Sequence, residues 1–201
     1  MIGPARLGRM SEVVELRQYT LRPGQRDVLA DLFMRHFVTG QEAVGMRILG
    51  VYYDLDRPDR FVWLRGFPDM ATRKAALSRF YFESEVWRAH ARAANATMVD
   101  TSDVLLLRPL TGVKLPVAPR LVATVHPRTG NIPAVEAAVR LETHPAENDF
   151  PQLPVRTDGP KVVWFNAFAT DEEQHSYLDS LALPREWSIR LAPVPTSPAS
   201  T

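Results

Sequence analysis

The sequence of 201 residues contains no cysteine. This absence excludes disulfide bonds, thiolate catalysis and zinc–thiolate sites, and it fits a reducing compartment. The sequence also has no run of about 18 apolar residues, so it predicts no membrane-spanning helix. The opening "MIGPARLGRM" leads into an alternating acidic segment and not into the apolar core of a signal peptide. We therefore expect a cytoplasmic protein with no membrane partner.

A strong charge of either sign is absent as well. With 24 basic against 23 acidic residues the net charge is +1, which argues against dedicated binding of nucleic acid. The sequence has no GxGxxG, GxxxxGK[ST] or GxSxG motif, so dinucleotide binding, P-loop chemistry and a nucleophile elbow have no support. No close metal-ligand spacing occurs among its histidines, which are His36, His90, His126, His144 and His175. We expect no metal and no tightly bound cofactor.

The chain does contain an internal repeat. "RFVWLRGFPD" at 60–69 returns in similar form as "KVVWFNAFATD" at 161–171. Both stretches read as an apolar strand centred on a tryptophan and followed by an acidic helix start. The repeat predicts two copies of one structural unit.

The first copy is expected over residues 12–110. Alternation predicts a strand at 12–21, and a buried stripe predicts a helix over 25–37 that stops at Gly40. A hairpin of two strands follows, then a helical crossover that starts after the cap residue Asp69, then a strand ending at Pro109. This β-α-β-β-α-β order is that of the ferredoxin-like unit.

The second, shorter copy is expected over residues 120–193, after a linker at 111–119. Asn131 and Pro133 have the chemistry of a helix start, so a short helix is predicted over 132–139. Two strands follow, then a helix capped by Thr170 or Asp171, then a last strand. Residues 1–11 are predicted to be a disordered leader and residues 194–201 a disordered tail.

The predicted fold class is α+β, with two tandem ferredoxin-like units that close face to face into a barrel. Such a unit carries helices on one face of its sheet and leaves the other face open, and two open faces can cover each other. We expect the enclosed face to carry the polar and aromatic alternating residues of the first and third strands, which are Glu15, Arg17, Tyr19, Phe61, Trp63 and Arg65.

Several of these segments resemble the NIPSNAP family of the dimeric α/β-barrel superfamily. The resemblance rests on "VVELRQYTLRPG" at 13–24, "MRILGVYYD" at 46–54, "RFVWLRGFPDMATR" at 60–73 and the crossover at 80–109. In the second half, 147–156 and 162–168 are similar to tandem members. The resemblance spans roughly residues 12–193 and implies the tandem barrel but no particular reaction. The wider superfamily includes cofactor-independent monooxygenases, haem enzymes, isomerases and amino-acid-binding modules.

Candidate ligand-binding residues come from the predicted inner face and from two insertions. They are Glu15, Arg17, Tyr19, Trp63, Arg65, Tyr81, Trp87, Asn148 and Arg156. The guanidinium groups could hold an anionic or enolic ligand, and the aromatic side chains could line a cavity. The insertions, which also contain Arg88, Asn95 and Phe150, could form a lid over one mouth of the barrel. The alternatives are a structural polar network, a packed core, and a dimer contact or plug made by the insertions.

Three functional hypotheses follow. The first is binding of a small aromatic or anionic metabolite between the two sheets. The second is a cofactor-independent monooxygenase or isomerase in which His126, Tyr19 or Glu15 moves a proton. The third is a non-catalytic interaction module with a packed interior. A homodimer is an additional expectation, since Phe80, Tyr81, Phe82 and Val86 could form an exposed apolar patch.

Overall fold

The computed structural model describes residues 11–110, 112–129 and 132–195. The predicted disordered ends fall largely outside these ranges, but three of their residues, Ser11, Val194 and Pro195, lie inside. Ser11 is buried against Gly66, and the backbone N–H of Val194 donates to the carbonyl of Val51 at 2.9 Å. At these two positions the prediction of disorder is wrong, because both residues pack against strands of the first unit.

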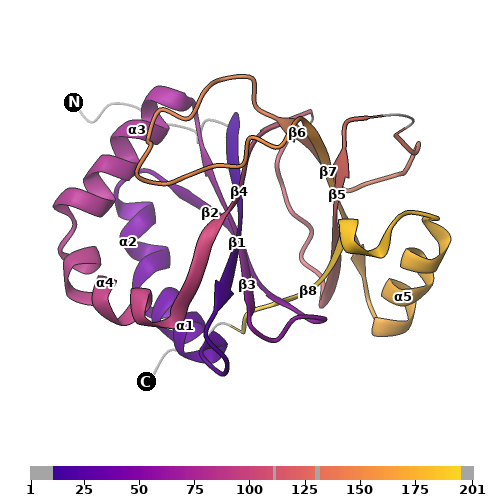
Figure 1. The fold of residues 1–201 in the computed structure, drawn as a ribbon, viewed down its shortest axis with the longest axis horizontal. Helices are drawn as coiled ribbons and strands as arrows, with labels where there is room; N and C mark the ends of the chain where they lie inside the picture. Colours follow the sequence, from indigo (N-terminus) through magenta and orange to yellow (C-terminus); the bar gives the residue numbers. More distant parts are fainter. Residues whose placement is uncertain (1–10, 111, 130–131, 196–201) are drawn as a thin grey trace, which may run out of the picture.

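The first half of the chain has the predicted β-α-β-β-α-β order (Figure 1). Its elements are β1 (Val13–Leu21), α1 (Arg26–Leu32), the π-helical turn Phe33–Phe37, α2 (Val38–Ala43), β2 (Arg47–Asp54), β3 (Arg60–Phe67), α3 (Met70–Ser78), a second π-helical turn (Arg79–Glu83), α4 (Glu85–Thr97) and β4 (Met98–Pro109). Asp69 caps α3 as expected by accepting a hydrogen bond from the N–H of Thr72. Gly40 does not end its helix, which continues to Ala43; the left-handed turn comes at Gly45.

The second half lacks one predicted helix. Its elements are β5 (Arg120–Pro127), β6 (Val139–Thr143), β7 (Lys161–Phe168), α5 (Asp171–Ser180), the 3₁₀ turn Arg185–Trp187 and β8 (Ser188–Pro193). Asn131 lies outside the described residues, and 132–138 are not helical. Backbone groups of this segment bond to other parts of the second unit instead: Ala138 N–H donates to Phe165, and Asn166 donates to the carbonyl of Glu136. These bonds replace the helical pattern. The cap of α5 is Thr170, in a capping box with Glu173.

The eight strands of the described ranges join in one closed antiparallel barrel with the order β1-β3-β2-β8-β5-β7-β6-β4. The halves have the equivalent orders β4-β1-β3-β2 and β8-β5-β7-β6. Two pairings close the barrel, β2 with β8 at Tyr53 and Ala192, and β4 with β6 at Arg108 and Glu142. The predicted closure within one chain is confirmed.

The prediction of which residues of the first sheet face the barrel interior is wrong, and the two faces are exchanged. The barrel interior is apolar, with Val14, Leu16, Val62 and Leu64 meeting Phe165 and other residues of the second half. Glu15, Arg17, Tyr19, Phe61, Trp63 and Arg65 lie on the outer face, beneath the helices that cover one side of the first half in Figure 1. Charged side chains need partners when buried, and the helices supply these partners while the apolar sheet of the other half cannot.

The segment between the halves also contributes to the interior. Val113 and Leu115 belong to the same apolar cluster as the inward side chains of the strands. Residues 112–119 therefore pack against the barrel and do more than connect its halves. Within the described ranges, no helix has both the length and the apolar character needed to cross a bilayer.

We predict that the barrel interior tolerates no loss of volume. Leu64 is fully buried there, so Leu64→Ala should reduce the free energy of unfolding by about 2–5 kcal/mol through lost burial and a cavity. The matched control is Val99→Ala on β4, where the side chain is 62% exposed and a change within about 0.5 kcal/mol is expected. Urea unfolding of both variants measures the difference, and equal effects would contradict a packed interior.

Candidate functional site

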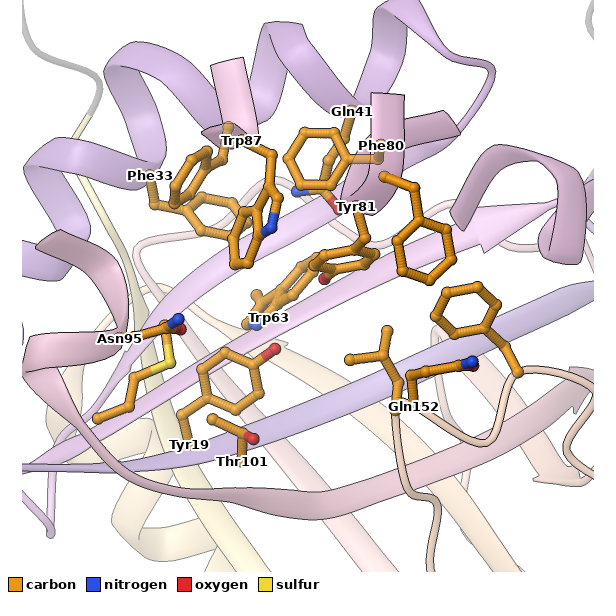
Figure 2. Close-up of a pocket in the computed structure, with 15 residues that line it drawn as sticks. Tyr19, Phe33, Gln41, Trp63, Phe80, Tyr81, Trp87, Asn95, Thr101 and Gln152 are labelled. Carbon is orange, nitrogen blue, oxygen red and sulfur yellow. The ribbon is translucent and has the colours of Figure 1, made fainter. Parts of the chain in front are cut away.

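A cavity of about 300 Å³ lies between the helices and the outer face of the first sheet. Figure 2 shows the side chains that surround it. They come from β1, β3, β4, the helical segment at 26–43, the helical crossover at 70–97 and the loop between β6 and β7. The lining residues are Tyr19, Phe33, Phe37, Gln41, Trp63, Phe80, Tyr81, Phe82, Trp87, Asn95, Met98, Thr101, Phe150, Gln152 and Leu153. The lining is mainly aromatic with a few polar groups, which is typical of a small-molecule site.

Edge-to-face contacts between aromatic rings build the walls. The ring of Trp63 lies 4.7 Å from Phe33 and 6.0 Å from Tyr19, measured between centroids, and Tyr81 lies 4.8 Å from Trp87. Each of these pairs joins two different elements or two parts of the crossover. Such packing holds the rings rigidly around the space between them.

The loop at 144–160 reaches from the second half to this cavity. The ring of Phe150 lies 6.3 Å from Tyr81 and 5.7 Å from Phe82. Arg73 of α3 holds the loop through an ion pair with Asp149 and a 3.1 Å hydrogen bond to the side-chain oxygen of Asn148. The two insertions therefore meet, but over the helical side of the first sheet and not over a mouth of the barrel as predicted.

Below the cavity, Glu15 is the centre of a buried cluster of charges. Its Oε2 accepts from Arg17 Nη1 at 2.6 Å and lies 2.7 Å from Arg65 Nη2, while its Oε1 accepts from Arg73 Nε at 2.7 Å. All four side chains are fully buried. The four groups sum to a charge of +2, and the partly exposed Asp149 reduces this to +1.

Three residues of the cavity lining are hydrogen-bonded to this cluster. Arg17 Nε donates to the hydroxyl of Tyr19 at 2.9 Å. Arg65 Nη1 donates to Gln41 Oε1 at 3.0 Å and, over a longer 3.4 Å, to the hydroxyl of Tyr81. Two phenol groups and one amide of the cavity lining are thus hydrogen-bonded directly to charged guanidinium groups of the cluster.

The burial of these groups changes their pKa values. Burial alone would raise the pKa of the Glu15 carboxyl, but Arg65, Arg17 and Arg73 together outweigh it and hold the pKa below its ordinary value of 4.5. Burial lowers the pKa of Arg17, yet the partners Tyr19 and Glu15 raise it overall. Burial, and then the neighbouring Tyr81, raise the pKa of Tyr19 against the effect of Arg17. At neutral pH Glu15 and Arg17 are charged and Tyr19 keeps its proton.

The predicted ligand-binding residues separate into groups. Tyr19, Trp63, Tyr81 and Trp87 line the cavity. Glu15, Arg17 and Arg65 lie beneath it, and Asn148 anchors the loop. Arg156 belongs elsewhere: it pairs with Asp103 and Asp158, beside a separate, charged pocket at one mouth of the barrel. Arg88 is exposed and Asn95 is part of the cavity lining.

The three candidate catalytic residues are not brought together. His126 lies on the outer face of the second half, where its ring packs 4.8 Å from Trp187 and 6.0 Å from Trp164. Glu15 and Tyr19 belong to the cluster in the first half. His126 is therefore separated from Glu15 and Tyr19, because the outer faces of the two halves point away from each other across the barrel (Figure 1). Proton transfer by any one of the three stays a prediction.

Sequence reasoning missed Arg73, Gln41 and Asp149. Arg73 had a readable signal, because it falls on the buried stripe of α3 with Ala76 and Leu77. A charged residue on an apolar stripe calls for a buried partner. Gln41 and Asp149 had no such pattern. The described residues contain no group of three acidic or histidine side chains arranged to hold a metal ion.

Comparison with solved structures identifies the class of fold. The chain resembles an anthrone oxidase-like protein over 95% of its own length and 97% of that protein's length, with a TM-score of 0.61 and 13% identity. At this identity the likeness shows the fold alone. Together with the strand order, it places the chain in the dimeric α/β-barrel class, with both halves of the barrel in one polypeptide.

The family likeness is carried by the first half, where residues 14–112 match the NIPSNAP family. An uncharacterised NIPSNAP-like domain protein from Burkholderia xenovorans is 25% identical, with a TM-score of 0.47, over 53% of this chain and 93% of its own. A NIPSNAP family protein from Agrobacterium tumefaciens is 18% identical, with a TM-score of 0.43, over 48% of this chain and 91% of its own. No curated protein matches. The match to the family model thus identifies a NIPSNAP domain in the first half of the chain, as the motifs of that half predicted.

We predict that Glu15 is essential for stability. Glu15→Gln removes the negative charge and leaves three buried guanidinium groups without it, so the free energy of unfolding should fall by about 3–5 kcal/mol. Asp31→Asn is the control, because Asp31 forms an exposed i,i+4 pair with Arg35 that contributes about 0.5 kcal/mol or less. Denaturant unfolding at pH 7 compares the two, and similar losses would refute the role of the cluster.

We also predict a specific pH dependence of this stabilisation. A carboxyl with a lowered pKa stabilises the fold fully above its unfolded pKa, and the stabilisation is lost as pH falls toward the folded pKa. The advantage of the wild-type protein over Glu15→Gln should therefore be constant above about pH 4.5 and shrink below it. Unfolding measurements between neutral and acid pH test this, and an advantage that grows in acid would reverse the assigned sign.

Proposed function

We propose that this NIPSNAP-domain protein binds a small planar metabolite, aromatic or conjugated, in the cavity beneath the crossover and the 144–160 loop. The observation that carries the proposal is the enclosure of a mainly aromatic cavity by insertions from both halves of the chain. Its volume lies at the lower end of the about 300–1,000 Å³ typical of ligand sites. This site replaces the predicted one between the sheets, because apolar side chains occupy the barrel interior.

A cofactor-independent oxygenase or isomerase is the second candidate. The observation in its favour is the fold shared with an anthrone oxidase-like protein. Proton transfer in such a reaction needs a base with a pKa near the working pH. Among the described residues that line the cavity there is no histidine, carboxylate or lysine, and the Tyr19 pKa is raised. These features favour binding over catalysis.

The packed interior does not favour the third candidate, an interaction module. The cavity lies outside the barrel, so a filled interior and a ligand site are compatible. The predicted apolar patch is also smaller than expected, since Phe80 is buried while Phe82 is 61% exposed. A homodimer and a cytoplasmic location stay predictions.

We predict that filling the cavity weakens binding strongly. Thr101 lines the cavity, so Thr101→Phe should weaken binding of the neutral aromatic probe N-phenyl-1-naphthylamine at least tenfold by occupying its space. Val99→Phe is the matched control, because the same residue is placed two positions away on the same strand at an exposed site. Probe fluorescence measures both affinities. If the wild-type protein does not bind the probe, or both variants bind it equally well, the cavity is not the site.

A further inference from the structure

The hydrogen-bonding groups around the cavity are unevenly distributed between donors and acceptors. The hydroxyl oxygens of Tyr19 and Tyr81 each accept a hydrogen bond from an arginine of the cluster beneath. A phenol whose oxygen already accepts in this way directs its own proton elsewhere. Figure 2 shows the Tyr19 hydroxyl turned toward the middle of the lining residues, on the side of Trp63 and Tyr81.

A third donor lies beside these two hydroxyls. Trp63 is 2% exposed and lines the cavity, and its indole Nε1–H has no acceptor among the described atoms. Buried donors are normally satisfied, and leaving one without a partner costs about 1–3 kcal/mol. The amide of Gln41 adds to the imbalance, because its oxygen accepts from Arg65 while its NH₂ group has no acceptor among the described residues.

The charge around the cavity, like the excess of hydrogen-bond donors, favours a ligand with an acceptor group. The named groups of the cluster, Glu15, Arg17, Arg65, Arg73 and Asp149, carry a summed charge of +1. Arg17 also keeps one buried nitrogen, Nη2, without an acceptor in the described part of the chain. No acidic side chain is found among the described lining residues. A negative or strongly electron-rich oxygen is stabilised in such surroundings, whereas a cation is not.

We infer that the ligand carries an acceptor oxygen on its planar system, as a phenolate, enolate, carboxylate or conjugated carbonyl, and that this oxygen binds between the hydroxyls of Tyr19 and Tyr81. The inference rests on the proposed function, since it names the class of molecule that the aromatic cavity takes. The aromatic walls hold the planar part, and the three donors select the oxygen. No bond is made or broken.

The test compares two naphthalene ligands of similar shape and opposite charge, with a larger neutral aromatic probe as the reference. The probes are 2-naphthoate, which presents an anionic acceptor, 2-(aminomethyl)naphthalene, which presents a cationic donor, and the neutral N-phenyl-1-naphthylamine. Calorimetry or competition against the neutral probe gives the affinities at neutral pH. We expect naphthoate to bind at least tenfold more tightly than the ammonium compound.

Variants then test whether the hydroxyls of Tyr19 and Tyr81 cause the preference for naphthoate over the ammonium compound. Tyr19→Phe and Tyr81→Phe each remove one hydroxyl and keep the ring, so each should reduce the naphthoate preference about threefold or more while leaving the neutral probe bound. Tyr53→Phe, outside the cavity, is the control and should change neither affinity. Tyr81 is only partly buried, so its variant remains informative if loss of the Tyr19 hydroxyl destabilises the fold.

The outcomes separate the inference from the proposed function. If the neutral probe binds and naphthoate has no advantage, the inference is overturned and the aromatic binding site survives. The inference is equally overturned if the advantage persists unchanged in both variants, because the donors would then lie elsewhere. If none of the three probes binds, the proposed function itself fails. A preference that is lost with either hydroxyl supports both.

Discussion

One carboxylate organises the first half of this protein. Glu15 on β1 binds guanidinium groups from its own strand, from β3 and from α3, so a single buried charge ties the sheet to the helices above it. Three buried arginines would be too costly without it. The aromatic cavity depends on this arrangement, because Arg17 and Arg65 hold the hydroxyls of Tyr19 and Tyr81 in the lining.

The same cluster couples the two halves. Arg73 reaches Glu15 with one nitrogen and the 144–160 loop with the others, through Asp149 and Asn148. The insertion of the second unit is thereby fixed over the first, where Phe150 completes the aromatic wall. The second half serves the site in two ways, by closing the barrel and by contributing this loop.

The repeated tryptophans show how far the halves have diverged. Trp164 of β7 donates its indole N–H to Tyr177 of α5 at 3.1 Å and is fully buried, so it behaves as part of a satisfied core. Trp63 of β3 occupies the corresponding position but faces a cavity and keeps its N–H without an acceptor among the described residues. Equivalent positions in one repeat thus have a structural role in one half and, we propose, a binding role in the other.

The sequence by itself determined the repeat, the order of elements in the first unit, the barrel and the NIPSNAP likeness, because hydrophobic periodicity, caps and turns are local signals. Alternation along β1 separated Glu15, Arg17 and Tyr19 from Val14 and Leu16, but it could not say which set faces the barrel interior. Only the tertiary structure decided that. The partners that make burial of these charges possible, Arg73, Gln41 and Asp149, come from distant segments, and no local pattern shows where a long loop will bind.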